Sequence, residues 1–561
     1  MKTRIWKRGI ACTVALTTVL STCSPQVAFA APEQTAKTWT PGVELDCRES
    51  YSKWSKETSY FTGDEWKGTG DNVNIVKVNR EQAHSTETIP YDSVEHAIAG
   101  AKDYRPDLSK YYQLITGEGK DWQLAVYKNE TEAVNAGVDG DFYKTDYNME
   151  AAPKYAGNNK VGTSETAYYG GFKKVTLPAS WQTQGFDFPI YTNITYPWPN
   201  AYGNAAYQLP LAPTVTNPIG YYRYTFDVDA DWMKANRKVF ISFQGVESAM
   251  YLYVNGHEVG YSEDSFDPAD FDITPFLNED GKDNLIAVKV VRWSEGSYLE
   301  DQDFTRMAGI FRDVYVYSTP STYLEDYKVE TDLVDDYKNC ELSLDVDMKN
   351  MSKETAGADL AVDVKLFDAD GNEVFTNGNA LQGSFSDVAK GKKSTASLEM
   401  KLDNPHLWTD EDPYLYTMVT TLFNSKSGAY YESISQQLGI REIEFTPTEV
   451  DENYNKTTKH YETVKLNGKP FKFRGTDRHD MDPETGRYVS HELYEKDITL
   501  MKQFNVNAIR TSHYPDDKYM YYLCDKYGIF VLAECNIECH GDNNGVMDNA
   551  NYPFWTSIED R

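Results

Sequence analysis

The sequence predicts a multidomain protein in which two antiparallel β-sandwiches precede the opening β/α units of a parallel barrel. Two observations predict the sandwiches: short runs of alternating apolar and polar residues fill much of residues 101–445, and turn-forming residues separate these runs. The third observation is a change of period near residue 446, after which helical stretches alternate with short apolar strands. A chain of 561 residues is long enough for several such domains.

The first thirty residues have the pattern of an export signal. Cations occupy four of the first eight positions, an apolar run spans residues 10–20, and Ala28-Phe29-Ala30 matches an A-x-A cleavage site. We therefore expect residues 1–30 to be a signal peptide that is cleaved near Ala30, which leaves the mature protein secreted or at the cell surface. A lipoprotein anchor at Cys23, preceded by residues 20–22, is an alternative reading of the same segment.

Composition restricts the partners of the mature chain. The formal net charge is −31, and an acidic surface argues against nucleic acid and against anionic membranes, beyond export itself. Residues 31–100 are polar with few periodic runs, which predicts an N-terminal arm. No disulfide framework is expected, because the cysteines beyond the signal are odd in number and sparse: Cys47, Cys340, Cys524, Cys535 and Cys539.

Residues 101–318 are predicted to form an antiparallel β-sandwich of jelly-roll type. Alternating runs at 238–243 and 251–254 are followed by Asn255-Gly256 and a further run at 258–261. An Asn-Gly pair between two such runs is the strongest short signal for a β-hairpin. The pattern continues at 284–290 and 314–317, so the whole segment has the short, evenly spaced strands of a sandwich.

Residues 319–445 are predicted to form a smaller, immunoglobulin-like β-sandwich. Apolar residues alternate with polar ones at 342–348 and again at 362–366. A turn is expected at 368–371 and a strand around 414–416.

Residues 446–561 are predicted to begin a TIM (β/α)8 barrel that stays incomplete. Strands are expected at 471–475, 507–510 and 530–534. One helix is expected from Ser490, and a second is expected to open at Pro515 and to end before Gly528. The apolar face of the first of these helices is predicted to comprise Leu493, Ile498, Met501 and Phe504.

A complete barrel needs about 250 residues, so about 115 residues supply three of its β/α units. Strands that alternate with helices run parallel, and function is expected at their carboxyl ends.

Polar side chains gather where these three strands end. His479 lies in the group that follows the first strand, and His513 lies in the group that follows the second. Glu534, Glu538 and His540 follow the third strand, so all three strands deliver histidine or carboxylate to one rim. The residues alone leave open whether Glu534 is an ion-pair partner of Arg510 or a site residue.

Glu538 and His540 are spaced i, i+2, which places both side chains on one face of an extended backbone. That spacing suits metal ligation, although two ligands are too few and a capped loop explains the pattern equally well. In the first sandwich, the acidic stretch 299–303 has the default reading of a solvated loop, and Asn193 that of a turn residue.

Several longer motifs resemble glycoside hydrolase family 2. Residues 292–303 and 309–314 are close to the signature of the family's large β-galactosidases, and the resemblance runs in family order from about residue 75 to the end. Further matches in the first sandwich are Trp181-Gln182, 189–197, Val254-Asn255-Gly256, Val259-Gly260-Tyr261 and Asp264-Ser265. Further matches in the last segment are 466–470, Arg474-Gly475, Arg478-His479, 512–515, Leu523-Cys524-Asp525 and Asn536-Ile537-Glu538.

The resemblance implies roles for single residues. Asp303 would bind galactosyl hydroxyls and help to hold Na⁺, and Asn193 would reach the same pocket. His479 and His513 would hydrogen-bond the sugar and stabilise the transition state more than the ground state. Glu538 and His540 match two ligands of the family's active-site Mg²⁺, whose third ligand is the acid/base Glu.

This sequence departs from the family pattern at several positions without losing a matched ligand. The family often has Asn at Asp477 and His-His-Pro at 481–483. Ala533, Cys535 and Cys539 stand where the family has Asp, Ala and Thr. An extra acid at Asp477 would alter pH dependence or substrate choice.

The implied activity is retaining hydrolysis of terminal non-reducing β-D-galactose in β-galactosides. Retaining glycosidases use two carboxyl groups about 5–5.5 Å apart. The family places both on later barrel strands, beyond Arg561, so we expect residues 1–561 alone not to hydrolyse galactosides. The alternatives are a β-glucuronidase, a β-mannosidase or a non-catalytic carbohydrate-binding protein, and the full-length enzyme's assembly as a homo-oligomer is left open.

Overall fold

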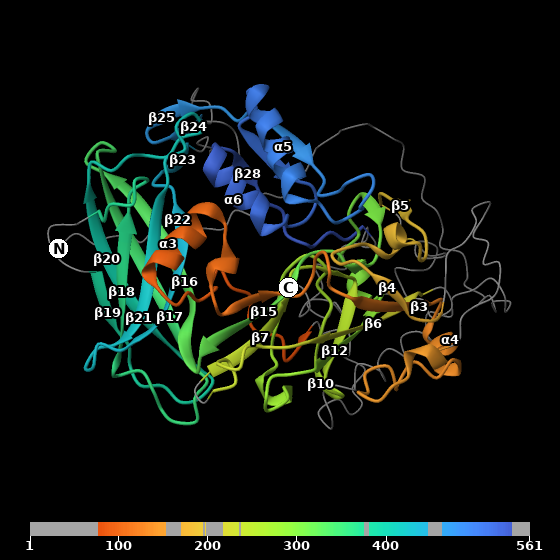
Figure 1. The fold of residues 1–561 in the computed structure, drawn as a ribbon. Coiled ribbons are helices and arrows are strands. Elements are labelled where there is room, and N and C mark those ends of the chain that lie inside the picture. Colours follow the sequence, from red (N-terminus) through yellow and green to blue (C-terminus); the bar gives the residue numbers. More distant parts are fainter. Residues whose placement is uncertain are drawn as a thin grey trace, which may run out of the picture. The chain divides into compact units, whose positions relative to one another are not determined.

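The structure, a computed structural model, describes residues 77–152, 170–194, 197, 217–234, 237–374, 381–446 and 463–540. The predicted signal peptide, its alternative anchor at Cys23, and the arm up to residue 76 lie outside the described residues. Within the part that is described, no helix combines the length and the apolarity needed to cross a membrane. The elements are labelled in Figure 1.

The first sandwich pairs a seven-stranded sheet with a four-stranded sheet, and all of its ladders are antiparallel. The predicted hairpin joins β9 to β10, with Asn255 at φ 51° and Gly256 at φ 84°, so this prediction is confirmed. The first sheet runs β1 (Lys77–Val78), β10 (His257–Ser262), β9 (Ala249–Val254), β12 (Asn284–Val291), β6 (Ile219–Phe226), β3 (Trp122–Tyr127), β4 (Lys173–Val175). The second runs β11 (Ala269–Asp272), β7 (Arg237–Phe243), β15 (Val314–Pro320), β2 (Tyr112–Leu114).

Alternate residues of these strands form one core. Ile241 of β7, Val288 of β12 and Val316 of β15 are fully buried in the same cluster, because successive side chains of a strand point to opposite faces. Trp122 also lies in this cluster, and its indole N–H donates to the Ile115 carbonyl at 2.8 Å. Two short ladders extend the sandwich: β5 (Ile190–Thr192) with β13 (Phe304–Arg306), and β8 (Val246–Glu247) with β14 (Gly309–Ile310).

The second sandwich has a three-stranded and a four-stranded sheet. The alternation predicted over 342–348 is confirmed, because Leu342, Leu344, Val346 and Met348 are all buried in its core. The sheets run β16 (Thr322–Val334), β17 (Asn339–Asn350), β20 (Lys392–Asp403) and β19 (Leu381–Ser384), β18 (Leu360–Phe367), β21 (Tyr416–Asn424), β22 (Tyr430–Leu438).

The described end of the predicted arm is bound to both sandwiches. β1 adds to the edge of β10, and Tyr91 pairs with Ser433 of β22. Helix α3 (Val94–Asp103), which the sequence analysis did not predict, begins after Ser93, whose side chain accepts the His96 N–H. Val94, Ala97, Ile98 and Ala101 have the i, i+3, i+4, i+7 spacing of an amphipathic helix, and α3 contacts β21 and β22.

Residues 463–540 contain the three predicted parallel strands and the two predicted helices that connect them. β26 (Gly475–Arg478), β27 (Ala508–Thr511) and β28 (Phe530–Leu532) form a parallel sheet, with α5 (His491–Gln503) and α6 (Lys518–Tyr527) between them (Figure 1). An antiparallel sheet precedes them, made of β23 (Ile443–Thr446), β24 (Thr463–Leu466) and β25 (Lys469–Phe471).

Three predictions in this segment were wrong in detail. The predicted strand 471–475 is split, because the turn at Asn467-Gly468 draws Phe471 into the antiparallel sheet and the parallel strand starts only at Gly475. Pro515 does not open α6; the Asp517 side chain accepts the Tyr519 N–H and caps the helix there. Phe504 follows the last turn of α5, so it leaves the apolar face and is 79% exposed.

Glu432 of β22 makes stability depend on pH. Burial raises the pKa of this carboxyl to about 8, although the Leu324 N–H and nearby Arg237 oppose the shift. Because the folded protein holds this proton more tightly than the unfolded chain, the free energy of unfolding falls as pH rises from about 4.5 through 8. We predict that Glu432→Gln, which cannot ionise, raises Tm relative to the parent protein at pH 8.5 and changes it little at pH 5.

Thermal unfolding followed from pH 5 to 8.5 measures this difference. Glu399→Gln, on an exposed position of β20, is the matched control and should follow the parent protein at every pH. Identical pH profiles for Glu432→Gln and the parent would contradict the assignment.

Candidate active site

The carboxyl ends of the three parallel strands bring the predicted histidines together. His479 directly follows β26, and His513 lies two residues beyond β27. Their imidazole rings are edge to face, with centroids 5.4 Å apart. The prediction that these strands deliver side chains to one rim is therefore correct for both residues.

Glu534 holds His513 in place. Its Oε2 lies 3.0 Å from Nδ1 of His513, and its Oε1 accepts from Nε of Arg510 at 2.5 Å. The sequence left two roles open for Glu534, and the structure gives it both: it pairs with Arg510 and it orients a site histidine. Nδ1 of His513 also lies 3.2 Å from Nη2 of Arg510. The Glu534 carboxylate and the Arg510 guanidinium therefore both contact the same ring nitrogen of His513.

Glu538 and His540 contact each other, as their i, i+2 spacing predicts. Nε2 of His540 lies 3.3 Å from Oε1 of Glu538, and Nδ1 lies 3.0 Å from the Asp301 carbonyl oxygen. The same Nδ1 lies 3.3 Å from the Oδ2 carboxylate oxygen of Asp301, and this side-chain hydrogen bond raises the pKa of His540. Burial raises the pKa of Glu538, and the imidazoles of His513 and His540 oppose that shift.

The pair is suited to a metal ion but does not by itself complete a metal site. The Asp301 carbonyl holds Nδ1 of His540, which directs Nε2 toward Glu538, as in ligating histidines whose other nitrogen is bonded to the protein. Among the residues that the structure describes, no three His, Cys, Asp or Glu side chains are grouped closely enough to hold a metal.

The first sandwich supplies Asp303 from the start of β13. β13 pairs with β5 so that Phe304 lies opposite Thr192. Asp303 precedes this pair and Asn193 follows it, so both residues stand at the same end of the ladder. The Tyr191 hydroxyl donates to Oδ1 of Asp303 at 2.7 Å. Asn193 itself is exposed, and its side chain accepts the N–H of Ile194.

Residues 299–303, termed here the sandwich loop, are hydrogen-bonded to the end of the third parallel strand. The Glu538 N–H donates to the Leu299 carbonyl at 2.6 Å, and the Asp301 N–H donates to the Glu538 carbonyl at 2.9 Å. This is one parallel bridge between two distant parts of the chain. The default reading of 299–303 as a solvated loop is wrong, because Leu299, Asp301 and Gln302 are fully buried.

Asn536 is the polar centre of this contact. Its Oδ1 accepts from Gln302 at 2.9 Å, and its Nδ2 donates to Glu300 at 2.8 Å and to Asp264 at 2.9 Å. Arg306 adds a cation, donating to Oδ1 of Asp301 at 2.6 Å. Neither Asn536 nor Arg306 was assigned a role from the sequence, although Asn536 lies in a matched motif; the partners of Asn536 are far away in sequence and become apparent only in the structure.

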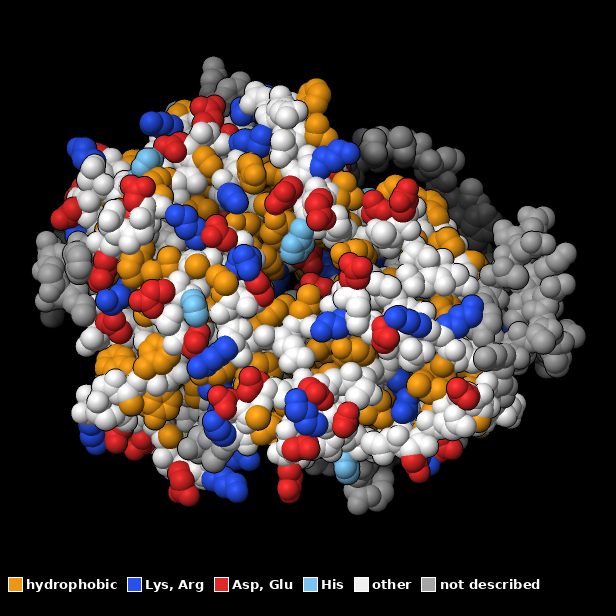
Figure 2. Space-filling view, in the orientation of Figure 1, with side chains coloured by type: hydrophobic (Ala, Val, Ile, Leu, Met, Phe, Trp, Pro, Cys, Tyr) orange, Lys and Arg blue, Asp and Glu red, His pale blue; other side chains and the backbone are white. Residues whose placement is uncertain are grey.

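Electrostatic coupling connects Asp303 with the barrel histidines. Burial lowers the pKa of His479, with further lowering by His513 and Arg487, while Asp303 and Asp477 oppose the shift. Asp303 and His513 thus influence the charge of His479, and His513 and His540 influence that of Glu538. The face drawn in Figure 2 is hollowed near its centre, with acidic side chains and a histidine beside the hollow.

A polar cavity of about 250 Å³ lies elsewhere, lined by Arg474, Lys502 and Asn507 among others. Arg474 and Asn507 precede β26 and β27, so this cavity is at the amino ends of the parallel strands. It is therefore separate from the rim that carries the histidines, and it takes no part in the candidate site.

We predict that Asn536→Ala uncouples the sandwich loop from the third strand. The variant leaves the Gln302 side-chain amide without its Asn536 acceptor. It also removes one of several hydrogen bonds at the Glu300 and Asp264 carboxylates, which keep Ser265 and the N–H groups of Phe266 and Asp267. We therefore expect the free energy of unfolding to fall by about 2 kcal/mol or more. Urea unfolding measures the loss, and hydrogen exchange should speed up at the amides of Asp301 and Glu538.

The matched control is Gln503→Ala, an exposed amide at the end of α5, which should change the free energy of unfolding by less than about 0.5 kcal/mol. If Asn536→Ala were as stable as this control, the contact would not hold the loop.

Comparison with known proteins identifies the architecture. Residues 163–320 match the sugar binding domain of glycosyl hydrolases family 2, residues 322–441 match a second model of glycosyl hydrolases family 2, and residues 458–559 match the family's TIM barrel domain. A crystal structure of Bacteroides uniformis β-glucuronidase is 24% identical with a TM-score of 0.56 and covers 76% of this chain and 42% of its own. A β-glycosidase from Bacteroides vulgatus is 20% identical with a TM-score of 0.54 and covers 80% of this chain and 48% of its own.

Among curated relatives, a β-galactosidase of Priestia megaterium is 40% identical over 85% of this chain, and one of Halalkalibacterium halodurans is 34% identical over 84%. The chain spans 40% and 39% of the lengths of these two relatives. The three family models follow one another along the chain, over the first sandwich, the second sandwich and the barrel segment. This chain belongs to glycosyl hydrolase family 2.

Proposed function

We propose a β-galactosidase function, in which terminal non-reducing β-D-galactose residues of β-galactosides are hydrolysed with retention at the anomeric carbon and residues 1–561 supply the sugar-binding part. The observation that supports this most is the arrangement at the ends of the parallel strands: His479 faces His513, Glu538 contacts His540, and the loop that carries Asp303 is hydrogen-bonded to Glu538. The names of the two relatives, both β-galactosidases, agree with it.

Each side chain has a task in this proposal. One oxygen of Asp303 accepts from Tyr191, and within the described residues its other oxygen has no hydrogen-bond partner, so it is placed to accept from sugar hydroxyls. His479 and His513 hydrogen-bond the sugar from the barrel rim, and Asn193 approaches from the sandwich. Groups fixed in this way act where charge develops in the transition state, which is how they accelerate the reaction.

The proposal includes two cations. Glu538 and His540 would hold Mg²⁺, and Asp303 would contribute to a Na⁺ site. The orientation of Nε2 of His540 toward Glu538 supports the first assignment. A bound Mg²⁺ stabilises nearby negative charge and assists proton transfer by neighbouring acids.

The names of the curated relatives favour a galactoside over a glucuronide, since both are β-galactosidases, at 40% and 34% identity. β-Glucuronidase is the second candidate, and its support is the structural likeness alone.

Export through residues 1–30 belongs to the same proposal, supported by the cationic start, the apolar run and the cleavage site of the sequence. Amino-terminal sequencing of the secreted protein is expected to begin just after Ala30. Assembly into a homo-oligomer is a further expectation for the full-length enzyme.

We further propose that residues 1–561 bind the sugar without turning it over. Retention requires two carboxyl groups about 5–5.5 Å apart on either side of the anomeric carbon. At the described rim, Glu534 is committed to Arg510 and His513, and Glu538 to His540. The later acids, Asp542, Asp548, Glu559 and Asp560, lack the context of the family's catalytic pair and lie outside the described residues.

Ligand-dependent thermal stabilisation and a chromogenic galactoside assay test this pair of proposals together. We predict that galactose raises the Tm of the 561-residue protein, that glucuronate does not, and that no turnover is detected. Asp303→Ala should weaken galactose binding about tenfold or more, whereas Glu279→Gln, an exposed acid elsewhere in the sandwich, should leave it unchanged.

Stabilisation by glucuronate but not galactose would move the assignment to the second candidate. Stabilisation by neither would contradict the proposed sugar site, and robust turnover would contradict the expected lack of activity.

A further inference from the structure

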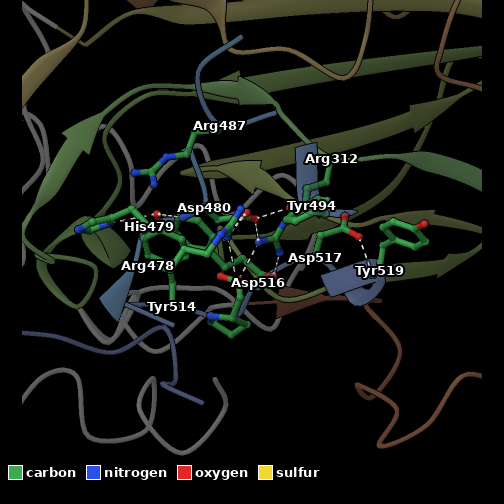
Figure 3. A network of polar contacts seen from close by, with 12 residues as sticks. Arg312, Arg478, His479, Asp480, Arg487, Tyr494, Tyr514, Asp516, Asp517 and Tyr519 are labelled. Carbon is green, nitrogen blue, oxygen red and sulfur yellow. Dashed lines mark hydrogen bonds and ion pairs between the residues drawn. The ribbon is translucent and has the colours of Figure 1, made fainter. Parts of the chain in front are cut away.

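Tyr514 is a buried phenol that contacts one site histidine and is adjacent in sequence to the other. Its side chain is fully buried. The hydroxyl lies 3.3 Å from Nδ1 of His479 and accepts the Asp480 N–H at 3.2 Å. Figure 3 shows these residues within one polar network. His513, which directly precedes Tyr514, faces His479 from the neighbouring strand end.

The ring of Tyr514 is fixed by residues of the first sandwich. Phe266 stacks on it with centroids 4.1 Å apart and planes at 15°, and Phe304 lies 5.8 Å away. The Arg487 guanidinium lies 5.0 Å from its centroid. Arg312 donates to the Phe266 carbonyl at 2.9 Å, which ties the stacking partner down in turn. The phenol therefore has little freedom to move its hydroxyl away from His479.

The protons available on Tyr514 and its neighbours determine which atom donates in the hydrogen bond between Tyr514 and His479. A phenol has one proton to donate, and the Asp480 N–H already occupies part of its acceptor capacity. Among the described residues, Nδ1 of His479 is the one acceptor within reach of that proton. Burial raises the pKa of Tyr514 to about 12, so the phenol keeps its proton throughout the neutral range.

We propose that Tyr514 is a positioning residue: its hydroxyl donates to Nδ1 of His479 and holds the ring as the neutral tautomer that carries its proton on Nε2. Nε2 has no hydrogen-bond partner among the described residues, so it presents an N–H to the sugar. His479, which the proposed function assigns to sugar binding, therefore donates from its Nε2–H to a hydroxyl oxygen of the sugar. This inference depends on the proposed function only for the identity of the ligand.

The charges around His479 agree with a neutral ring. Burial, His513 and Arg487 lower its pKa, and Asp303 and Asp477 act in the opposite direction with less effect. The neighbouring Asp480 carboxylate is committed elsewhere, to Arg312, Arg478 and Tyr494, as Figure 3 shows. No carboxylate contact at Nδ1 of His479 competes with the phenol within the described residues.

The tautomer can be read directly in the unaltered protein. Imidazole ¹⁵N NMR of the 561-residue chain at pH 7.5, with the signals of His479 assigned by their loss in His479→Gln, reports which ring nitrogen carries the proton. We expect an unprotonated Nδ1 and a protonated Nε2. A proton on Nδ1, as the other tautomer or as the imidazolium, overturns the proposal. This measurement requires neither a folded Tyr514 variant nor sugar binding.

Tyr514→Phe tests the consequence, with Tyr494→Phe as the matched control. Tyr494 is a buried phenol of the same network that donates to Asp480 at 2.7 Å and has no contact with His479. We expect Tyr514→Phe to shift His479 toward a mixture of tautomers and to weaken galactose binding about two- to tenfold by calorimetry. Tyr494→Phe should leave the His479 tautomer unchanged.

The two variants distinguish positioning from stability. An unchanged tautomer in a folded Tyr514→Phe protein overturns the inference, as does an equal shift in both variants. If the unaltered protein binds no galactose, the proposed function fails, and the tautomer of His479 still decides the role of Tyr514.

Discussion

The hydrogen-bonded contact between the sandwich loop and the end of the third parallel strand is the interaction on which the site depends. Two backbone hydrogen bonds at Glu538 and the Asn536 side chain fix residues 299–303 against the barrel segment. Asp303 is the last residue of this loop, so the same bonds that bury the loop set the position of its carboxylate relative to the barrel segment. The stacking of Phe266 on Tyr514 and the ion pair of Arg312 with Asp480 are further contacts between the first sandwich and the barrel segment.

Much of this interface is charged. It holds side chains in a fixed arrangement more than it stabilises the fold. Asp264, Glu300 and Asp301 are all buried beside Asn536, and Arg306 is the cation that contacts Asp301. Moving charges out of water costs several kcal/mol per ion, which their attraction only partly offsets. The cost is acceptable where side chains must be held in one arrangement, as a site that stabilises a transition state requires.

The sequence predicted the architecture because periodicity and turn chemistry are local. Alternation at 342–348 predicted a buried sheet face, and the order of strands and helices after 446 predicted parallel strands whose ends share a rim. The buried role of Asn536 was not predictable, since its partners Asp264 and Gln302 lie more than two hundred residues away. The same holds for Tyr514, whose orientation is set by stacking on Phe266.

The most direct test of the account is a crystal structure of the 561-residue protein with galactose. The account predicts one sugar held from two sides, with its hydroxyls in contact with Asp303 of the sandwich and with His479 and His513 of the barrel rim. Galactose bound to the sandwich alone, or at a place away from the loop that contacts Glu538, would contradict it.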